Sequence, residues 1–139
     1  RTSKEVARIA FKMANLSNKD IVYELGSGEA TALMVAAKEF GAKGVGIEID
    51  PIRAFISSMV LRSNGLSNKI TIKRNNFFDE DISEATVVFI YLVPNTLNRL
   101  IPKFKKELKK GTPIISYKYE MNLPLRKFDK ENELRLYVI

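Results

Sequence analysis

Short apolar, β-rich runs alternate with helical stripes of apolar residues along almost the whole chain. The runs at 21–25, 45–49 and 86–93 are apolar on both faces, as are the buried strands of parallel sheets. Between them, over 30–40 and 52–60, apolar residues recur every three or four positions, which is the spacing of an amphipathic helix. This alternation favours an α/β fold with a parallel sheet.

The remaining runs complete the predicted topology. Residues 70–73, 113–119 and 134–139 are further strand candidates, and 125–128 is a weaker one. No helical pattern separates the last pieces, so we expect them to pair as an antiparallel hairpin. Four strand–helix units followed by this hairpin predict a Rossmann-like doubly wound sheet, mostly parallel, in a single domain over 1–139.

The chain has neither histidine nor cysteine. Their absence excludes disulfide bonds, thiolate zinc sites and the usual general base at neutral pH. We therefore predict no metal site, and any catalysis must rest on carboxylates, phenols, amides or binding geometry.

The net charge is +7, from 23 Lys and Arg against 16 Asp and Glu. Such a surface attracts nucleic acid, anionic lipid or an acidic protein. The denser basic stretch at 103–110 has no interleaved aromatic residues, so we favour a solvated helix face over a nucleic-acid site. The sequence has no apolar run long enough to span a membrane and no secretory signal pattern, and we expect a cytoplasmic protein.

A glycine turn follows the first predicted strand and precedes a helix. Glu24 ends that strand, and Gly26, Ser27 and Gly28 form the turn, where glycine permits close approach of the backbone to a ligand. Thr31 stands where a dinucleotide fingerprint has its third glycine. An acid beside the turn repels a pyrophosphate but attracts an ammonium or a sulfonium. We therefore predict S-adenosylmethionine as the cofactor; the alternative for Glu24 is a solvated strand end.

Side chains at the ends of the next two strands extend this cofactor site. Glu48 lies twenty residues after Gly28, the spacing at which an acid meets ribose hydroxyls in nucleotide-binding α/β folds. Ile49 follows it and is placed to pack on an adenine face. Asn76 after the third strand can read an adenine edge, and the ring of Phe77 can cover the base.

Tyr91 ends the fourth predicted strand, where methyl group and acceptor should meet. It is our candidate catalytic residue, with a ring face that can stabilise a cation. A phenol of ordinary pKa is a poor base at neutral pH, so we favour the ring over the hydroxyl. A buried core tyrosine is an equally weighted alternative. The run 91–95 lacks the Asp/Asn-Pro-Pro-aromatic tetrapeptide typical of amide and adenine nitrogen methylation, which argues against base methylation.

The segments 21–28, 46–49, 76–78 and 81–88 together resemble the archaeal seven-strand protein-lysine methyltransferases, members of the class I methyltransferases. The mitochondrial lysine methyltransferases of the ATP synthase c subunit and the adenine nucleotide translocase are similar to these. The resemblance covers nearly the whole chain, through the ending at 134–139. It implies transfer of a methyl group to a lysine side chain of a protein by in-line displacement, which mostly requires alignment.

By the same resemblance, Glu24, Gly26 and Gly28 line the methionine half of the cofactor, Glu48 holds the ribose, and Asn76 and Phe77 hold the adenine. Tyr91 and the strand 116–119, including Ser116 and Tyr119, border the lysine channel.

The chain departs from the family at two places. The family usually reads Gly-Asp-Gly-Arg where this sequence reads Gly28-Glu29-Ala30-Thr31, and we expect the change to weaken cofactor binding or alter substrate docking. The family's Pro-rich segment just upstream of the position of Thr2, which the resemblance implies helps close the site, is not in this sequence. Two alternatives stay open: an RNA or small-molecule methyltransferase on the same fold, and a non-catalytic cofactor-binding domain.

Overall fold

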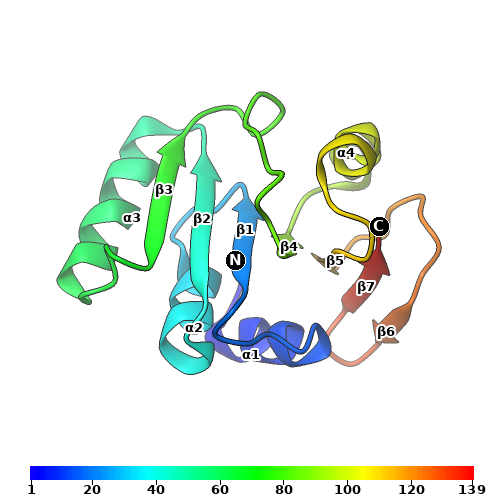
Figure 1. Ribbon diagram of the computed structural model, residues 1–139, viewed down its shortest axis with the longest axis horizontal. Coiled ribbons are helices and arrows are strands. Elements are labelled where there is room, and N and C mark those ends of the chain that lie inside the picture. The colour runs from blue at the N-terminus through cyan, green and yellow to red at the C-terminus, as the bar shows by residue number, and fades with distance from the viewer.

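The chain folds into a seven-stranded sheet with helices on both faces (Figure 1). Its computed structural model describes residues 1–139. The elements, in chain order, are α1 (Lys4–Met13), β1 (Ile21–Leu25), α2 (Thr31–Phe40), β2 (Lys43–Glu48), α3 (Pro51–Ser63), β3 (Ile70–Arg74), β4 (Val87–Ile90), α4 (Pro94–Glu107), β5 (Pro113–Tyr117), β6 (Lys127–Asp129) and β7 (Leu134–Val138). None of the helices has the length and apolar character needed to cross a membrane.

The strands lie in the order β3-β2-β1-β4-β5-β7-β6. β3, β2, β1, β4 and β5 are parallel neighbours, whereas β7 runs antiparallel to both β5 and β6. The predicted Rossmann-like sheet with a C-terminal antiparallel hairpin is confirmed. The number of strand–helix units is three rather than the predicted four, because a loop, not a helix, joins β3 to β4.

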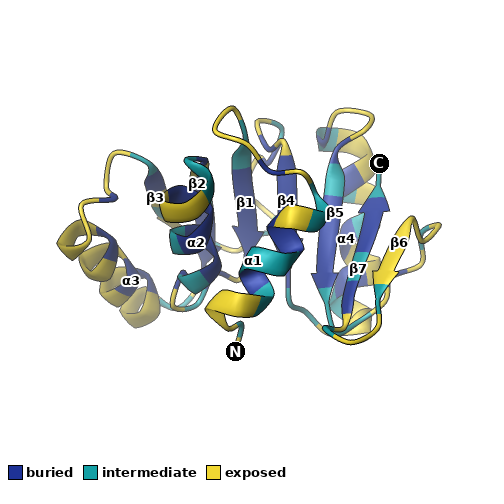
Figure 2. Cartoon of the chain, turned by 90° about the horizontal axis from the view of Figure 1, so that it is seen from below, coloured by how far each residue is buried: buried dark blue, intermediate teal, exposed yellow.

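Two apolar clusters lie on opposite faces of the sheet. One contains Phe11 and Leu33, from α1 and α2, packed on Phe89 of β4. The other contains Leu100 and Phe104 of α4 together with strand residues such as Ile90 of β4. Figure 2 shows α1 and α2 in front of the strands and α4 behind them. The strand order reverses between β1 and β4, and ligands of open α/β sheets bind beyond the carboxyl ends of the strands at such a point.

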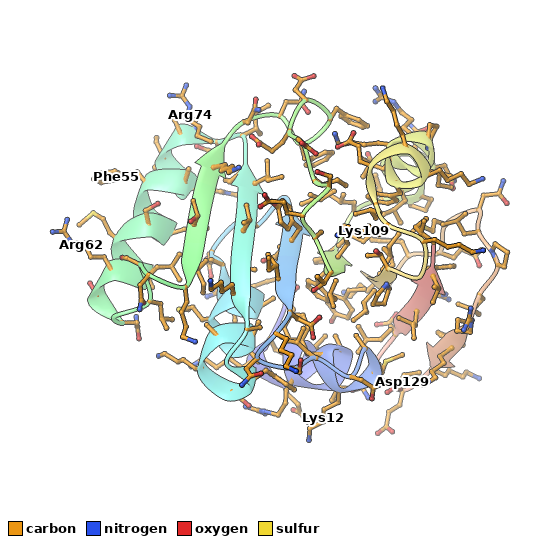
Figure 3. The ribbon with its side chains drawn as sticks, in the orientation of Figure 1. Lys12, Phe55, Arg62, Arg74, Lys109 and Asp129 are labelled. Carbon is orange, nitrogen blue, oxygen red and sulfur yellow. The ribbon has the colours of Figure 1, made fainter.

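Helix α3 does not bury the apolar stripe that its spacing predicts. Its buried residues are Ala54, Ser57 and Leu61, and Phe55 projects away from the sheet (Figure 3). The residues of the predicted stripe are all exposed; they are Ile52, Phe55, Ile56, Met59 and Val60. Small residues on the inner face let the helix lie close to the glycine turn, where Ser57 donates a hydrogen bond to the Gly28 carbonyl at 2.5 Å.

The start of α3 is fixed by its own sequence. The Asp50 carboxylate accepts hydrogen bonds from the Ile52 and Arg53 amides, and Pro51 occupies the first helical position, as both residue types favour. This short connection holds the end of β2, with Glu48, against the turn that follows β1.

Candidate functional site

The turn after β1 is held tightly against β2. The Gly26 and Ser27 amides both donate to the Ile47 carbonyl, at 2.8 and 3.2 Å, and Gly26 and Gly28 have φ of +75° and +53°, which glycine adopts without strain. A side chain at Gly46 of β2 would meet the Ser27 Cβ and Oγ at 2.7 Å. Glycine at position 46 therefore lets the turn lie directly over β2.

A cavity of about 560 Å³ opens beside this turn. Five of the predicted site residues line it: Glu24, Gly26, Ser27, Gly28 and Tyr91. A Cβ at Gly28 would have no neighbour within 4 Å, so the backbone there is open to a ligand. The start of α2 and the first turns of α3 complete the wall, with Thr31, Arg53, Ile56 and Ser57 among its residues.

Glu24 lies on the cavity wall as a buried acid without a cation beside it. Its side chain is 6% exposed, and its Oε1 atom has no hydrogen-bond partner. Burial, and then the negative charge of Glu48, raise the pKa of Glu24 well above its ordinary value. Burying a carboxylate without a partner costs free energy, and a bound ammonium group would supply the missing partner for its charge. The Ser27 hydroxyl is likewise buried without a partner, so the residues present fit a cationic, hydrogen-bonding cofactor.

Glu48 is also buried, yet its carboxylate is already hydrogen-bonded. Oε1 accepts from the Gly28 amide at 2.7 Å and Oε2 from the Asp50 amide at 3.0 Å. Glu48 thus ties the turn after β1 to the start of α3, a positioning role that its spacing alone did not predict. Each carboxylate oxygen has further acceptor capacity, so the predicted contact with ribose hydroxyls remains compatible with this geometry.

The residues predicted to hold adenine lie around the turn but do not line the cavity. Phe77 lies against the turn, its Cε2 atom 3.8 Å from the position of a Cβ at Gly26. Asn76 is exposed, and its Oδ1 atom accepts from the Phe78 amide at 3.0 Å, which leaves its NH₂ group available. Ile49 is 64% exposed, an apolar surface directly after Glu48.

Tyr91 belongs both to the cavity and to a cluster of tyrosines at the ends of β4 and β5. Its ring centroid lies 4.8 Å from that of Tyr117 and 6.2 Å from that of Tyr119, the latter pair stacked. The Lys118 Nζ atom stands over this cluster, 5.6 Å from the Tyr91 centroid and 5.4 Å from that of Tyr117. The cluster is therefore a cation-binding aromatic surface that already holds one ammonium group.

Ser116 differs from the prediction that it borders a channel. It is fully buried, and its hydroxyl donates to the Tyr119 carbonyl at 2.5 Å. Through this bond Ser116 supports the turn that carries Tyr119, and its own side chain is not exposed.

Three participants escaped the sequence reasoning. Ser57 stood unnoticed within an apolar helical pattern, and Tyr117 and Lys118 were covered only by their strand range. The pattern Tyr-Lys-Tyr at 117–119 is the one sequence signal for Tyr117 and Lys118. Only the pairing of β4 with β5 shows that Tyr91 lies beside them.

Proteins similar to this chain show which protein family it belongs to. Residues 24–124 match the model of the ANTKMT methyltransferase domain. The chain belongs to this family, and the prediction of an S-adenosylmethionine-dependent methyltransferase is confirmed.

Individual relatives agree with the assignment. A protein-lysine N-methyltransferase of Saccharolobus islandicus is 40% identical over 121 residues, which cover 86% of this chain and 75% of the relative. The crystal structure of an RNA methyltransferase from Salinibacter ruber in complex with S-adenosyl-L-homocysteine superimposes with a TM-score of 0.95 at 34% identity, covering 100% of this chain and 93% of that one. A ribosomal protein L11 methyltransferase of Deinococcus radiodurans is 30% identical over 106 residues, and the chain matches 38% of its length.

Proposed function

We propose that the chain transfers the methyl group of S-adenosylmethionine to lysine side chains of proteins. The observation that carries the proposal is the place of Tyr91, which lines the cavity and at the same time forms an aromatic surface with Tyr117 and Tyr119. A lysine approaching that surface meets the rings that hold an ammonium group in this structure. The name of the Saccharolobus relative supports the same acceptor.

The residues of the chain divide the work between binding and alignment. Glu24 supplies the buried negative charge for the ammonium group of the cofactor, and Gly28 presents bare backbone to it. Glu48 positions the turn and offers its free lone pairs to ribose hydroxyls, while Ile49, Asn76 and Phe77 surround the adenine. When bound, the cofactor supplies a methyl group on a sulfonium, an electrophile that needs no acid catalyst.

On the acceptor side, Tyr91 holds the incoming ammonium group through its ring. After the proton has left, the same ring stabilises the positive charge that develops on nitrogen as the methyl group is transferred. No histidine or cysteine is available to remove the amine proton, so we expect water to take it. The rate of methyl transfer then depends mainly on how well the amine and the methyl group are aligned. The chain is accordingly an enzyme that relies on positioned charge and aromatic faces.

The direct test is methyl transfer from labelled S-adenosylmethionine to a panel of folded proteins and lysine peptides, with their fully trimethylated counterparts, which have no nitrogen lone pair left, as the matched control. We expect label on the unmodified lysines, located by peptide mass spectrometry. Cofactor binding without label on any protein or peptide would contradict the proposal and favour a non-catalytic cofactor-binding domain.

A second candidate function is RNA methylation, because the Salinibacter relative carries that name and this chain has a net charge of +7. RNA added to the same reaction distinguishes the two candidates. Label on RNA together with a steep loss of RNA binding as salt increases would support RNA, whereas label on lysine in the presence of excess RNA supports protein.

A further inference from the structure

A lysine of the chain itself occupies the aromatic surface that the proposed function assigns to the acceptor. Lys118 lies between Tyr117 and Tyr119 in the chain, and its Nζ atom stands 5.6 Å from the ring centroid of Tyr91 and 5.4 Å from that of Tyr117. Both distances fall within the ~6 Å range of a cation–π contact. Tyr91 also lines the cofactor cavity, so this ammonium group stands at the boundary between cofactor and acceptor.

The backbone at Lys118 is held in a conformation that ordinary residues avoid. Its φ is +69°, and the Tyr119 amide donates to the Tyr117 carbonyl at 2.9 Å across it, which is the rare γ-turn with positive φ. Such backbones persist only where their surroundings enforce them. Here the Lys118 amide donates to the Glu133 carbonyl at 2.7 Å, and the Arg135 guanidinium donates to the Lys118 carbonyl at 2.6 Å.

These contacts come from β7 and from the turn before it, so the C-terminal hairpin fixes the direction of the Lys118 side chain. The neighbouring Tyr91 side chain, and after it Tyr117, raise the pKa of Lys118, in accord with a cation held by the cluster. The fold thus delivers one particular lysine to the acceptor surface.

We propose that Lys118 is a methyl acceptor of the chain's own active site, modified within the same molecule. The inference rests on the proposed function. The neutral Nζ amine of Lys118 forms a nitrogen–carbon bond to the methyl carbon of S-adenosylmethionine. The sulfur–carbon bond breaks, and its electron pair stays on sulfur to give S-adenosylhomocysteine. The ammonium proton passes to water, so that the reaction needs no further reactant.

The first experiment follows the chain alone with labelled S-adenosylmethionine, by intact mass and peptide mapping. We expect methyl groups on Lys118 in preference to other lysines, with a fractional rate that does not change over a tenfold range of protein concentration. Lys118→Arg should abolish that label, whereas Lys130→Arg, at an exposed lysine on the β6–β7 turn, should leave it unchanged.

A second measurement does not depend on methyl transfer. With a limiting amine-acetylating reagent and no cofactor, Lys118 should react more slowly than Lys130, because the rings and the raised pKa disfavour the free amine. Removing the ring in Tyr91→Ala should accelerate acetylation of Lys118 by roughly two- to fivefold, the fold-change equivalent to an exposed cation–π contact, and should leave Lys130 unaffected.

Three results would overturn the inference. Label spread evenly over exposed lysines, a fractional rate proportional to protein concentration, or equal acetylation of Lys118 and Lys130 would each show that the cluster does not present Lys118 to the site. Label on lysine peptides but none on Lys118 would reject this inference and leave the proposed function standing. No label on either, with cofactor bound, would reject both.

Discussion

Around the proposed cofactor cavity the structure places a buried carboxylate with no cation beside it, whereas around the tyrosine cluster it places an ammonium group already in contact with two rings. The first arrangement is incomplete in the free protein, since Glu24 Oε1 has no partner. The second is satisfied by Lys118. Tyr91 belongs to both.

The difference concerns where binding energy comes from. A cofactor that brings an ammonium group to Glu24 removes an existing penalty, so its binding is favoured by the free state of the protein. A protein lysine that approaches the tyrosine cluster must replace Lys118, so its net gain is smaller than the contact suggests. We therefore expect changes on the cavity side to have the larger effects on binding.

The largest effect is expected from Glu48→Ala. The substitution removes the acceptor of the Gly28 and Asp50 amides as well as the proposed ribose contact. Hydrogen bonds to a charged group contribute about 1.5–3 kcal/mol, so cofactor affinity should fall by at least about tenfold, and the free protein should unfold more easily. Calorimetry and urea unfolding measure the two effects.

Glu29→Ala is the matched control for Glu48→Ala. Glu29 lies on the same turn and also lines the cavity, but its carboxylate is exposed and pairs with Arg1, and exposed ion pairs contribute little. A larger loss of cofactor affinity in Glu29→Ala than in Glu48→Ala would show that the ribose is held elsewhere.

Glu24→Gln should separate stability from binding. Because the folded pKa of Glu24 is raised, the contribution of Glu24 to stability is fully present below the ordinary carboxyl pKa of 4.5 and is lost as pH rises from there through the raised value. Glutamine removes this dependence, so the free variant should be more stable than wild type at neutral pH while binding the cofactor more weakly.

Proton release provides the check on Glu24. At a pH below the raised pKa of Glu24, wild-type protein should release a proton when the cofactor's ammonium group binds, seen by calorimetry in buffers of different ionisation enthalpy. The glutamine variant should release none. Equal proton release in the two proteins would assign the proton to another group.

The cavity side was accessible to sequence reasoning because its parts are local. Glu24 and Gly28 belong to one turn, and the strand before it is recognisable from its apolar run, so Glu48 could be placed by spacing alone. The bonds of Glu48 to the turn were not predictable, since they depend on how closely β2 and α3 approach it. Helix α3 shows the limit of periodicity: the stripe with Phe55 and Met59 has the right spacing but faces outward.

The tyrosine cluster could hardly be predicted from the sequence, because its parts come from distant segments of the chain. The position of Lys118 depends on hydrogen bonds to Glu133 and Arg135, which come from the C-terminal hairpin. Nothing in the residues near 118 indicates a positive φ, a conformation that a lysine rarely adopts. Contacts between distant strands, rather than local propensity, decided this part of the site.

A smaller effect is expected at Tyr91, which connects the two regions. Tyr91→Ala removes a ring contribution of about 0.5–2 kcal/mol, equivalent to roughly a two- to thirtyfold loss of methyl transfer rate. Tyr91→Phe keeps the ring and should retain most activity. Steady-state rates on one protein substrate compare the two variants, and a phenylalanine variant as slow as the alanine variant would show that the hydroxyl carries the function.

The smallest effect is expected at Ala30, where the chain departs from its family's glycine. Ala30 is the N-cap of α2 with φ of +60° and ψ of +22°, a left-handed conformation that costs an L-residue about 1–2 kcal/mol. Glycine relieves this strain but removes a buried methyl group, a loss of about 0.8 kcal/mol. The greater freedom of glycine in the unfolded chain costs a further ~0.4–1 kcal/mol. These terms nearly offset one another, so Ala30→Gly should lie within about 0.8 kcal/mol of wild type in its free energy of unfolding.

Ala36→Gly is the matched control, because Ala36 is equally buried, at 1% exposure, but lies within the helix α2. There glycine loses the same methyl group with no strain to relieve, and it adds a helix propensity penalty of about 1 kcal/mol. Urea unfolding should therefore show Ala36→Gly to be about 1.5–2 kcal/mol less stable than wild type. If Ala30→Gly proved as destabilising as Ala36→Gly, the left-handed backbone at position 30 would carry no strain. Alanine at this position would then favour folding of this chain relative to glycine.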